Sequence, residues 1–159
     1  MIWGAVVGGL AGTFVLTEML RAAGELGWTR IDIPFLLGTA VTTDRVRAKA
    51  AGYALHLVFG LLFALGYWVI FVVVRESGVL LGALLGLLHA LFASTALVNV
   101  LLPVVHPRMG TGFDAAGSSP TLEPPGFLLL NYGRQTPLVT VLGHIVYGAI
   151  VGGFASWAG

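Results

Sequence analysis

The stretch AAGYALHLVFGLLFALGYWVIFVVV, residues 50–74, decides the fold of this chain. It contains no Asp, Glu, Lys or Arg, and its one imidazole belongs to His56. Because an α-helix needs roughly 20 apolar residues to cross the hydrocarbon core of a bilayer, the stretch predicts a membrane-spanning helix.

Three further apolar runs of spanning length occupy residues 2–20, 78–105 and 137–158. The composition agrees with them, since 57% of the 159 residues are hydrophobic and 9% are charged, whereas soluble domains carry about 25% charged residues. The mean hydropathy is +0.95. We therefore predict an all-α membrane protein with four transmembrane helices in a single domain, residues 1–159. Soluble catalysis is excluded.

The distribution of basic residues predicts the orientation of these helices. The connection between the first two runs carries five of them: Arg21, Arg30, Arg45, Arg47 and Lys49. The third connection adds Arg108 and Arg134, and the second has only Arg75. Because cytoplasmic loops are enriched in Lys and Arg, we expect loops 21–49 and 106–136 in the cytoplasm and both termini outside.

The two halves of the chain resemble each other. An offset of 88 residues gives three identical pairs: His56 with His144, Val58 with Val146, and Gly60 with Gly148. An offset of 78 residues aligns small residues of the first run with those of the third, including Gly4 with Gly82 and Gly8 with Gly86. We predict two tandem helical hairpins, residues 1–75 and 76–159, related by a pseudo-two-fold axis along the membrane normal. The alternative is chance similarity among helices rich in Gly, Ala and Leu.

Glycine recurs at every fourth position in three of the runs: Gly4, Gly8 and Gly12; Gly78, Gly82 and Gly86; Gly148 and Gly152. Helices in membranes associate through close packing at small residues, so these stripes are expected where helices meet. The alternative is that some of them form a homo-oligomer interface.

Four titratable residues come from four different helices on the same predicted side of the membrane: Glu18, His56, His106 and His144. Ionisable groups are costly in hydrocarbon, and those that persist usually face the protein interior. Imidazole and carboxylate ligands that converge in a helix bundle suit a divalent transition metal such as zinc, iron or copper. We predict a metal site near the cytoplasmic side, with these four residues as ligands.

Other interpretations of the same residues stay open. Haem b bound between His56 and His144 would use the two rings as a facing bis-imidazole pair. A proton or ion relay is a further interpretation. In the plainest alternative each His hydrogen-bonds a backbone carbonyl or Glu18 and does nothing more. His89 lies near mid-membrane and has no counterpart, because Ala11 occupies the matching position of the first half.

Three classes of function fit these features. The first is a membrane protein with a metal or haem site, redox-active or enzymatic. The second is a non-catalytic accessory or assembly subunit of a larger membrane complex, and the third is a small oligomeric transporter or channel. The lipid bilayer is the expected partner, and no nucleic-acid module or nucleotide-binding loop is present in the sequence.

The loops carry three short motifs: HPRMG at 106–110, LEPPGFL at 122–128 and NYGR at 131–134. In these motifs the chain resembles a group of uncharacterised bacterial membrane proteins, and the resemblance extends over residues 29–152. It implies a multi-pass protein of the bacterial inner membrane and carries over no activity and no catalytic residue. Between the first two motifs, residues 110–121 are rich in Gly, Ser and Ala and are predicted to be flexible.

Overall fold

The computed structural model describes residues 1–109 and 122–157. Within them, four helices are long and apolar enough to cross a membrane, as predicted. They are α1 (Ile2–Glu25), α3 (Arg45–Val74), a composite third helix and α6 (Thr136–Trp157). The third runs from α4 (Val79–Phe92) through the π-helical segment η1 (Ala93–Leu101) to α5 (Leu102–Val105). The stretch 110–121, predicted to be flexible, lies outside the described residues.

The helix α3 begins at Arg45, five residues before the start of the apolar run 50–74. Its N-cap is Asp44, whose side chain accepts a hydrogen bond from the Arg47 backbone N–H at 2.8 Å, which satisfies one of the free donors of the first turn. With 30 residues, α3 is about 45 Å long at 1.5 Å per residue. It therefore exceeds the roughly 30 Å thickness of a hydrocarbon core.

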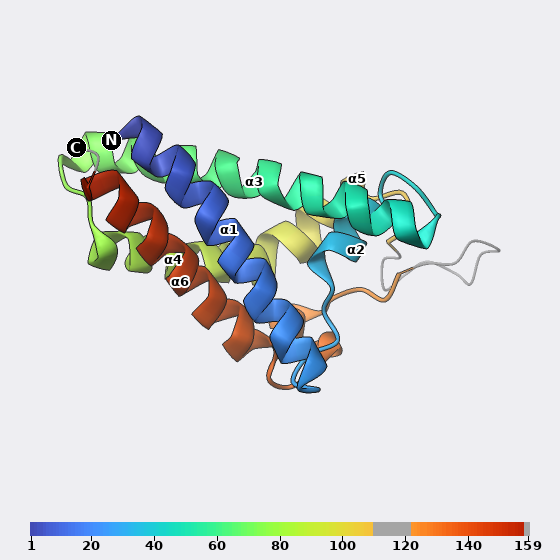
Figure 1. Ribbon diagram of the computed structural model, residues 1–159. Coiled ribbons are helices and arrows are strands. Elements are labelled where there is room, and N and C mark those ends of the chain that lie inside the picture. Colours follow the sequence, from blue (N-terminus) through green and yellow to red (C-terminus); the bar gives the residue numbers. More distant parts are fainter. Residues whose placement is uncertain (110–121, 158–159) are drawn as a thin grey trace.

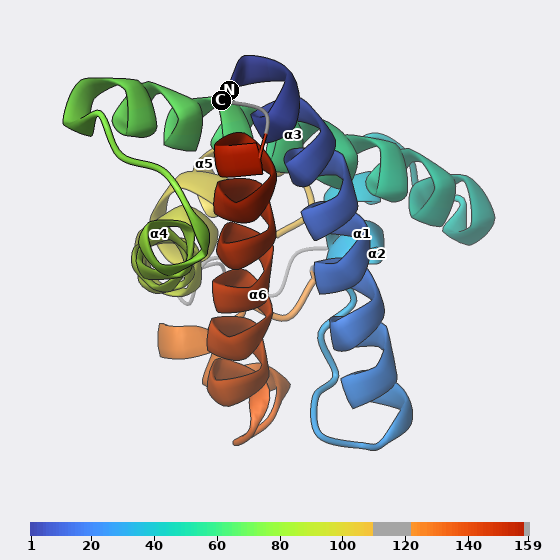
Figure 2. The ribbon, with the colours of Figure 1, turned by 60° about the vertical axis from the view of Figure 1, so that its left-hand side comes forward.

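The helix α6 lies between α1 and α4, and α3 crosses over α1 instead of running alongside it (Figures 1 and 2). A short helix, α2 (Ile33–Gly38), packs against the N-terminal half of α3. The contact is close because Gly52 leaves room for the backbone of Pro34, and Gly38 leaves room for that of Ala48. The apolar part of the first loop is thus folded onto the protein.

The glycine stripes pack inside this chain, which confirms the prediction that helices meet there. A Cβ at Gly82 would collide with the carbonyl oxygen of Gly148, and a Cβ at Gly148 with that of Gly82. On the other side of α6, Gly4 lies against the backbone of Phe154. The backbones of α1, α6 and α4 are therefore in van der Waals contact, which is how helices associate in lipid.

The helices α1 and α3 contact each other at positions four residues apart. Gly9 faces Ala64, and the next turn places Thr13 against Gly60. The last of these contacts is between Thr17 Oγ1 and His56 Nδ1, 3.0 Å apart. Beyond it the two helices diverge toward the N-terminal end of α3 (Figure 1), and this divergence creates the space for the site described below.

The predicted two-fold axis is not evident in the packing. It would make the α1–α6 pair equivalent to the α4–α3 pair, yet the backbones of α3 and α4 are held apart. Large side chains fill the space between them, with the rings of Phe63 and His89 stacked at 3.8 Å. His89 stands where the first half has Ala11, so a bulky residue replaces a small one at that contact. The duplication remains a prediction.

The third helix contains a π-helical segment that the uninterrupted apolar run did not indicate. Within η1 the Asn99 side chain donates to the carbonyl oxygens of Ser94 at 3.0 Å and Thr95 at 3.1 Å. Side-chain amides compete in this way for backbone acceptors, and Pro103 lacks an N–H with which to continue regular pairing. Both features favour the wider turn of a π-helix over that of an α-helix.

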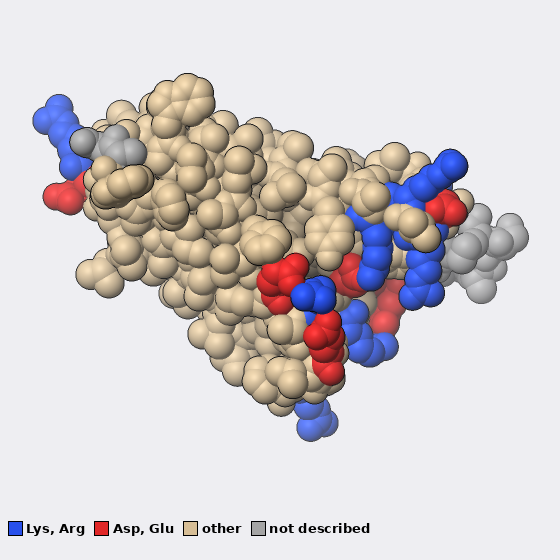
Figure 3. All heavy atoms as spheres, in the orientation of Figure 1, with Lys and Arg blue, Asp and Glu red and all other residues tan. Residues whose placement is uncertain are grey.

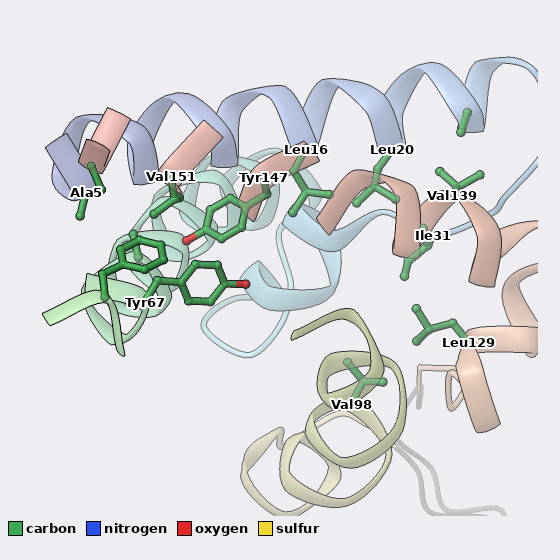
Figure 4. Close-up of a cluster of buried hydrophobic side chains, with 14 residues drawn as sticks. Ala5, Leu16, Leu20, Ile31, Tyr67, Val98, Leu129, Val139, Tyr147 and Val151 are labelled. Atoms are coloured by element: carbon green, nitrogen blue, oxygen red, sulfur yellow. The ribbon is translucent and has the colours of Figure 1, made fainter. Parts of the chain in front are cut away.

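Polar and apolar residues are separated along the molecule. Figure 3 shows most Lys, Arg, Asp and Glu side chains gathered where α1 ends and α3 begins, with a smaller charged group at the opposite end and an uncharged surface between them. Inside, Tyr67 and Tyr147 lie next to each other, while Leu16, Leu20 and Val139 continue the core along α1 and α6 (Figure 4). This separation is what a membrane-spanning protein requires.

Candidate functional site

A pocket of about 510 Å³ lies where α1 and α3 diverge. Its deepest residues along the two helices are Thr17 and His56, which hydrogen-bond to each other. Apolar side chains form part of its wall: Leu20, Ile31, Ile33 and Pro34. Charged residues surround its opening: Arg21, Glu25, Arg30, Asp32 and Lys49. We call this space the interfacial pocket.

The charges around the interfacial pocket are paired. Arg21 contacts Glu18 at 2.7 Å and Glu25 at 3.1 Å, and Lys49 contacts Asp32 at 3.1 Å. Since exposed ion pairs of this kind contribute little to stability, these side chains are free to exchange a partner for a bound molecule. The opening therefore carries both signs of charge and little net charge.

The wall formed by residues 29–34 is hydrogen-bonded to the second long loop, residues 106–136. The Arg30 backbone N–H donates to the Tyr132 carbonyl oxygen at 2.8 Å, and the hydroxyls of Thr29 and Thr136 lie 2.8 Å apart. Burial, with a smaller contribution from the Glu123 carboxylate, raises the pKa of Tyr132. Its hydroxyl therefore stays protonated and donates to the Glu123 carbonyl oxygen at 2.8 Å. The two loops form one structure beside the pocket.

A second polar cluster lies deeper, between α3, α4 and α6. His89 Nδ1 is 3.2 Å from the Tyr67 hydroxyl, and the rings of His89 and His144 meet edge to face at 4.7 Å. The Tyr147 hydroxyl donates to the Gly60 carbonyl oxygen at 2.5 Å. We call His89, His144, Tyr67 and Tyr147 the inner cluster. It joins α3 to α6 and α4 by polar contacts at the place where glycine packing is absent.

The sequence reasoning missed the two tyrosines and the contact made by His89. One signal was present, because Tyr147 lies three residues after His144 and therefore on the same side of a helix. Another was the replacement of Ala11 by His89 between the two halves. Neither signal indicates which helix these side chains contact.

Two of the four predicted metal ligands are engaged elsewhere. His106 is only 3% exposed, and its Nε2 donates to the Leu36 carbonyl oxygen at 3.0 Å while Nδ1 accepts from the Arg108 backbone N–H at 3.2 Å. Both ring nitrogens are therefore used. The Glu18 carboxylate is paired with Arg21, and the Glu18 side chain is 35% exposed, so Glu18 is not enclosed in the interior, which differs from the prediction.

The predicted four-ligand site is not assembled. In residues 1–109 and 122–157, no group of three or more His, Asp or Glu side chains is arranged to hold a metal ion. The haem interpretation requires the rings of His56 and His144 to face each other across a porphyrin, whereas the ring that contacts His144 is that of His89. The His56 ring instead lines the interfacial pocket.

No protein-family model matches this chain, and neither a curated protein nor a solved structure matches it. The likeness of the loop motifs to a group of bacterial membrane proteins therefore stays a prediction. The chain is an all-helical protein with four helices suited to span a membrane.

Proposed function

We propose that this protein binds a small amphipathic molecule in the interfacial pocket, as a multi-pass membrane protein. The observation that carries the proposal is the pocket itself, which has about 510 Å³ of space and ends at the Thr17–His56 pair. Sites for small molecules usually enclose about 300 to 1,000 Å³ and combine apolar walls with a few polar groups.

The chemistry of the lining supports an amphipathic ligand. Leu20, Ile31 and Ile33 offer apolar surface to a hydrocarbon or ring portion. The paired charges at the opening suit a polar head with no net charge or with both signs of charge, because the opening presents Lys and Arg beside Asp and Glu and carries little net charge. A lipid headgroup and a free metabolite share this chemistry.

Filling the pocket should abolish binding without damaging the fold. A Cβ at Gly24 would meet only the Thr29 carbonyl oxygen, at 3.8 Å, and Gly24 lines the pocket, so we expect the Gly24→Leu side chain to extend into the pocket. We expect the wild-type protein, purified from membranes, to retain a molecule that native mass spectrometry detects and that Gly24→Leu loses at least tenfold.

Gly66→Leu is the matched control, because a Cβ there meets nothing within 4 Å and Gly66 does not line the pocket. Both changes also replace a helical glycine by a better helix former. Equal retention by wild type, Gly24→Leu and Gly66→Leu would rule out the pocket as the binding site. A stoichiometric metal lost on His56→Gln would instead restore the coordination hypothesis.

We further propose that the charged end faces the cytoplasm of a bacterial cell, as the Lys and Arg bias indicates. The sequence contains no Cys, so single-cysteine variants report exposure without background. In intact cells, a membrane-impermeant maleimide should label Glu76→Cys and should label Arg134→Cys only after permeabilisation. The reverse pattern would invert the proposed topology.

The other two hypotheses have less support from the packing. An accessory subunit would offer its small-residue stripes to a partner, but Gly4, Gly82 and Gly148 are engaged within the chain. A transporter would need an opening on the other side of the membrane. The inner cluster lies beyond the pocket, and the Ala5, Ala64 and Val151 side chains farther along are buried core.

A further inference from the structure

The hydrogen bonds around Thr17 determine which nitrogen of His56 carries a proton. Thr17 Oγ1 lies 2.7 Å from the Thr13 carbonyl oxygen. A carbonyl oxygen only accepts, and a hydroxyl has one hydrogen to donate, so the Thr17 hydrogen is directed to Thr13. Toward His56 Nδ1, 3.0 Å away, the Thr17 oxygen must then accept. His56 Nδ1 therefore carries the hydrogen.

A neutral imidazole protonated on Nδ1 has a lone pair on Nε2. Among the described residues, no donor lies within hydrogen-bond distance of His56 Nε2. The ring lines the interfacial pocket beside Thr17, Tyr53 and the apolar wall. The His144 ring is close enough to interact with it electrostatically, but its one N–H, on Nδ1, donates to the Thr140 carbonyl oxygen. The deep end of the pocket thus presents a base that can accept a hydrogen bond.

We infer that the molecule bound in the interfacial pocket is a hydrogen-bond donor, a hydroxyl- or amino-bearing amphiphile whose O–H or N–H is accepted by His56 Nε2. The inference rests on the proposed function, because it names the chemistry of the ligand at that same pocket. Thr17 acts as a positioning residue, since it sets the tautomer of His56. A ligand with only acceptor groups would leave two lone pairs facing each other, so it should be rejected.

Two other histidines give internal controls for the tautomer. His144 Nδ1 lies 2.8 Å from the Thr140 carbonyl oxygen, so this nitrogen also carries the hydrogen. His106 has the opposite arrangement, with Nδ1 accepting from Arg108 N–H and Nε2 donating to Leu36. Nitrogen-15 NMR of the imidazoles in lipid bilayers should therefore report Nδ1–H at His56 and His144 and Nε2–H at His106.

The test of the positioning role combines this spectrum with Thr17 variants. Thr17→Ser keeps the hydroxyl and should keep the Nδ1–H signal of His56. Thr17→Val removes the acceptor at similar volume, so His56 should show the Nε2–H tautomer or a mixture, while His144 and His106 do not change. An Nε2–H signal at His56 in the wild-type protein would overturn the inference.

The test of ligand chemistry uses two probes that differ by one hydrogen-bond donor, decan-1-ol and its methyl ether. Binding is measured on amphipol-solubilised full-length protein, with Gly24→Leu as the blank for nonspecific partition. We expect the alcohol to bind roughly fivefold more tightly, the ratio for about one net hydrogen bond, and Thr17→Val to reduce this ratio toward one.

The outcomes separate the two proposals. Equal binding of alcohol and ether above the Gly24→Leu blank would overturn the donor inference and leave the pocket as a binding site. Binding of neither probe above the blank, together with no retained molecule in the wild-type protein, would contradict the proposed function and with it the inference.

Discussion

Replacing Gly82 by alanine should lower the free energy of unfolding by about 2 kcal/mol or more, since overpacking costs roughly 1 to 3 kcal/mol and backbone clashes fall at the upper end. A Cβ at this position collides with the carbonyl oxygen of Gly148, and Gly148 in turn lies against Gly86. No rotamer change can relieve the collision, because both groups belong to helix backbones. The α4–α6 contact must therefore open.

A glycine-to-alanine change at Gly66 should instead raise the free energy of unfolding. Gly66→Ala adds its Cβ to open space and should stabilise α3 by roughly 0.5 to 1 kcal/mol, because alanine is the better helix former. Unfolding in mixed micelles with increasing sodium dodecyl sulfate, followed by tryptophan fluorescence, measures both variants. Similar unfolding curves for Gly82→Ala and Gly66→Ala would show that the glycine contact does not hold the helices together.

The second large effect is expected at His106. His106→Ala leaves the Leu36 carbonyl oxygen and the Arg108 N–H without their partner in a site that is 3% exposed. A buried polar group without a partner costs about 1 to 3 kcal/mol, so the variant should lose roughly 2 to 4 kcal/mol and release α2 from the end of the third helix. Limited proteolysis within residues 29–49 should become several times faster.

The exposed neighbour Val105 supplies the control, because Val105→Ala removes a side chain that is 74% exposed and should leave the proteolysis rate unchanged. Metal content distinguishes this structural role from the coordination role predicted from the sequence. If His106→Ala released a bound metal while α2 stayed protected, the hydrogen-bonding role would be contradicted.

Much of the architecture could be predicted because the bilayer imposes strong local requirements. A run such as 50–74 has to be helical once it enters hydrocarbon, and glycines at every fourth position have to face a neighbouring backbone. The N-cap at Asp44 likewise involves neighbouring residues alone, since its side chain bonds within its own helix. These features depend on residues close together in the sequence.

The site was harder to predict because its contacts join distant residues. His106 bonds to Leu36, 70 positions earlier, and residues 29–34 close a pocket against α1 and α3. Helical periodicity shows which face of its own helix carries His56, but it does not show whether another histidine, a threonine or empty space lies opposite. Prediction of a four-ligand metal site assumed that inward-facing groups converge, whereas here two of them were already paired.

The asymmetry of the two halves has a similar origin. Matching residues such as Gly4 and Gly82 both pack against α6, so similar sequences do not meet equivalent partners. His89 of the second half matches Ala11 of the first. This larger residue lies where α3 and α4 are far apart, and the inner cluster occupies the space between them. Sequence similarity between the halves predicts similar helices. How closely two helices pack depends on the side chains at their interface.

Binding of a donor ligand in the interfacial pocket can be tested by a high-resolution structure from crystals grown in a lipidic mesophase without added ligand. We expect elongated density in the interfacial pocket, with one polar atom within about 3.2 Å of His56 Nε2, the distance of an ordinary hydrogen bond. A pocket closed by its own Leu20 and Ile33 side chains, with His56 Nε2 bonded to the protein, would contradict this expectation.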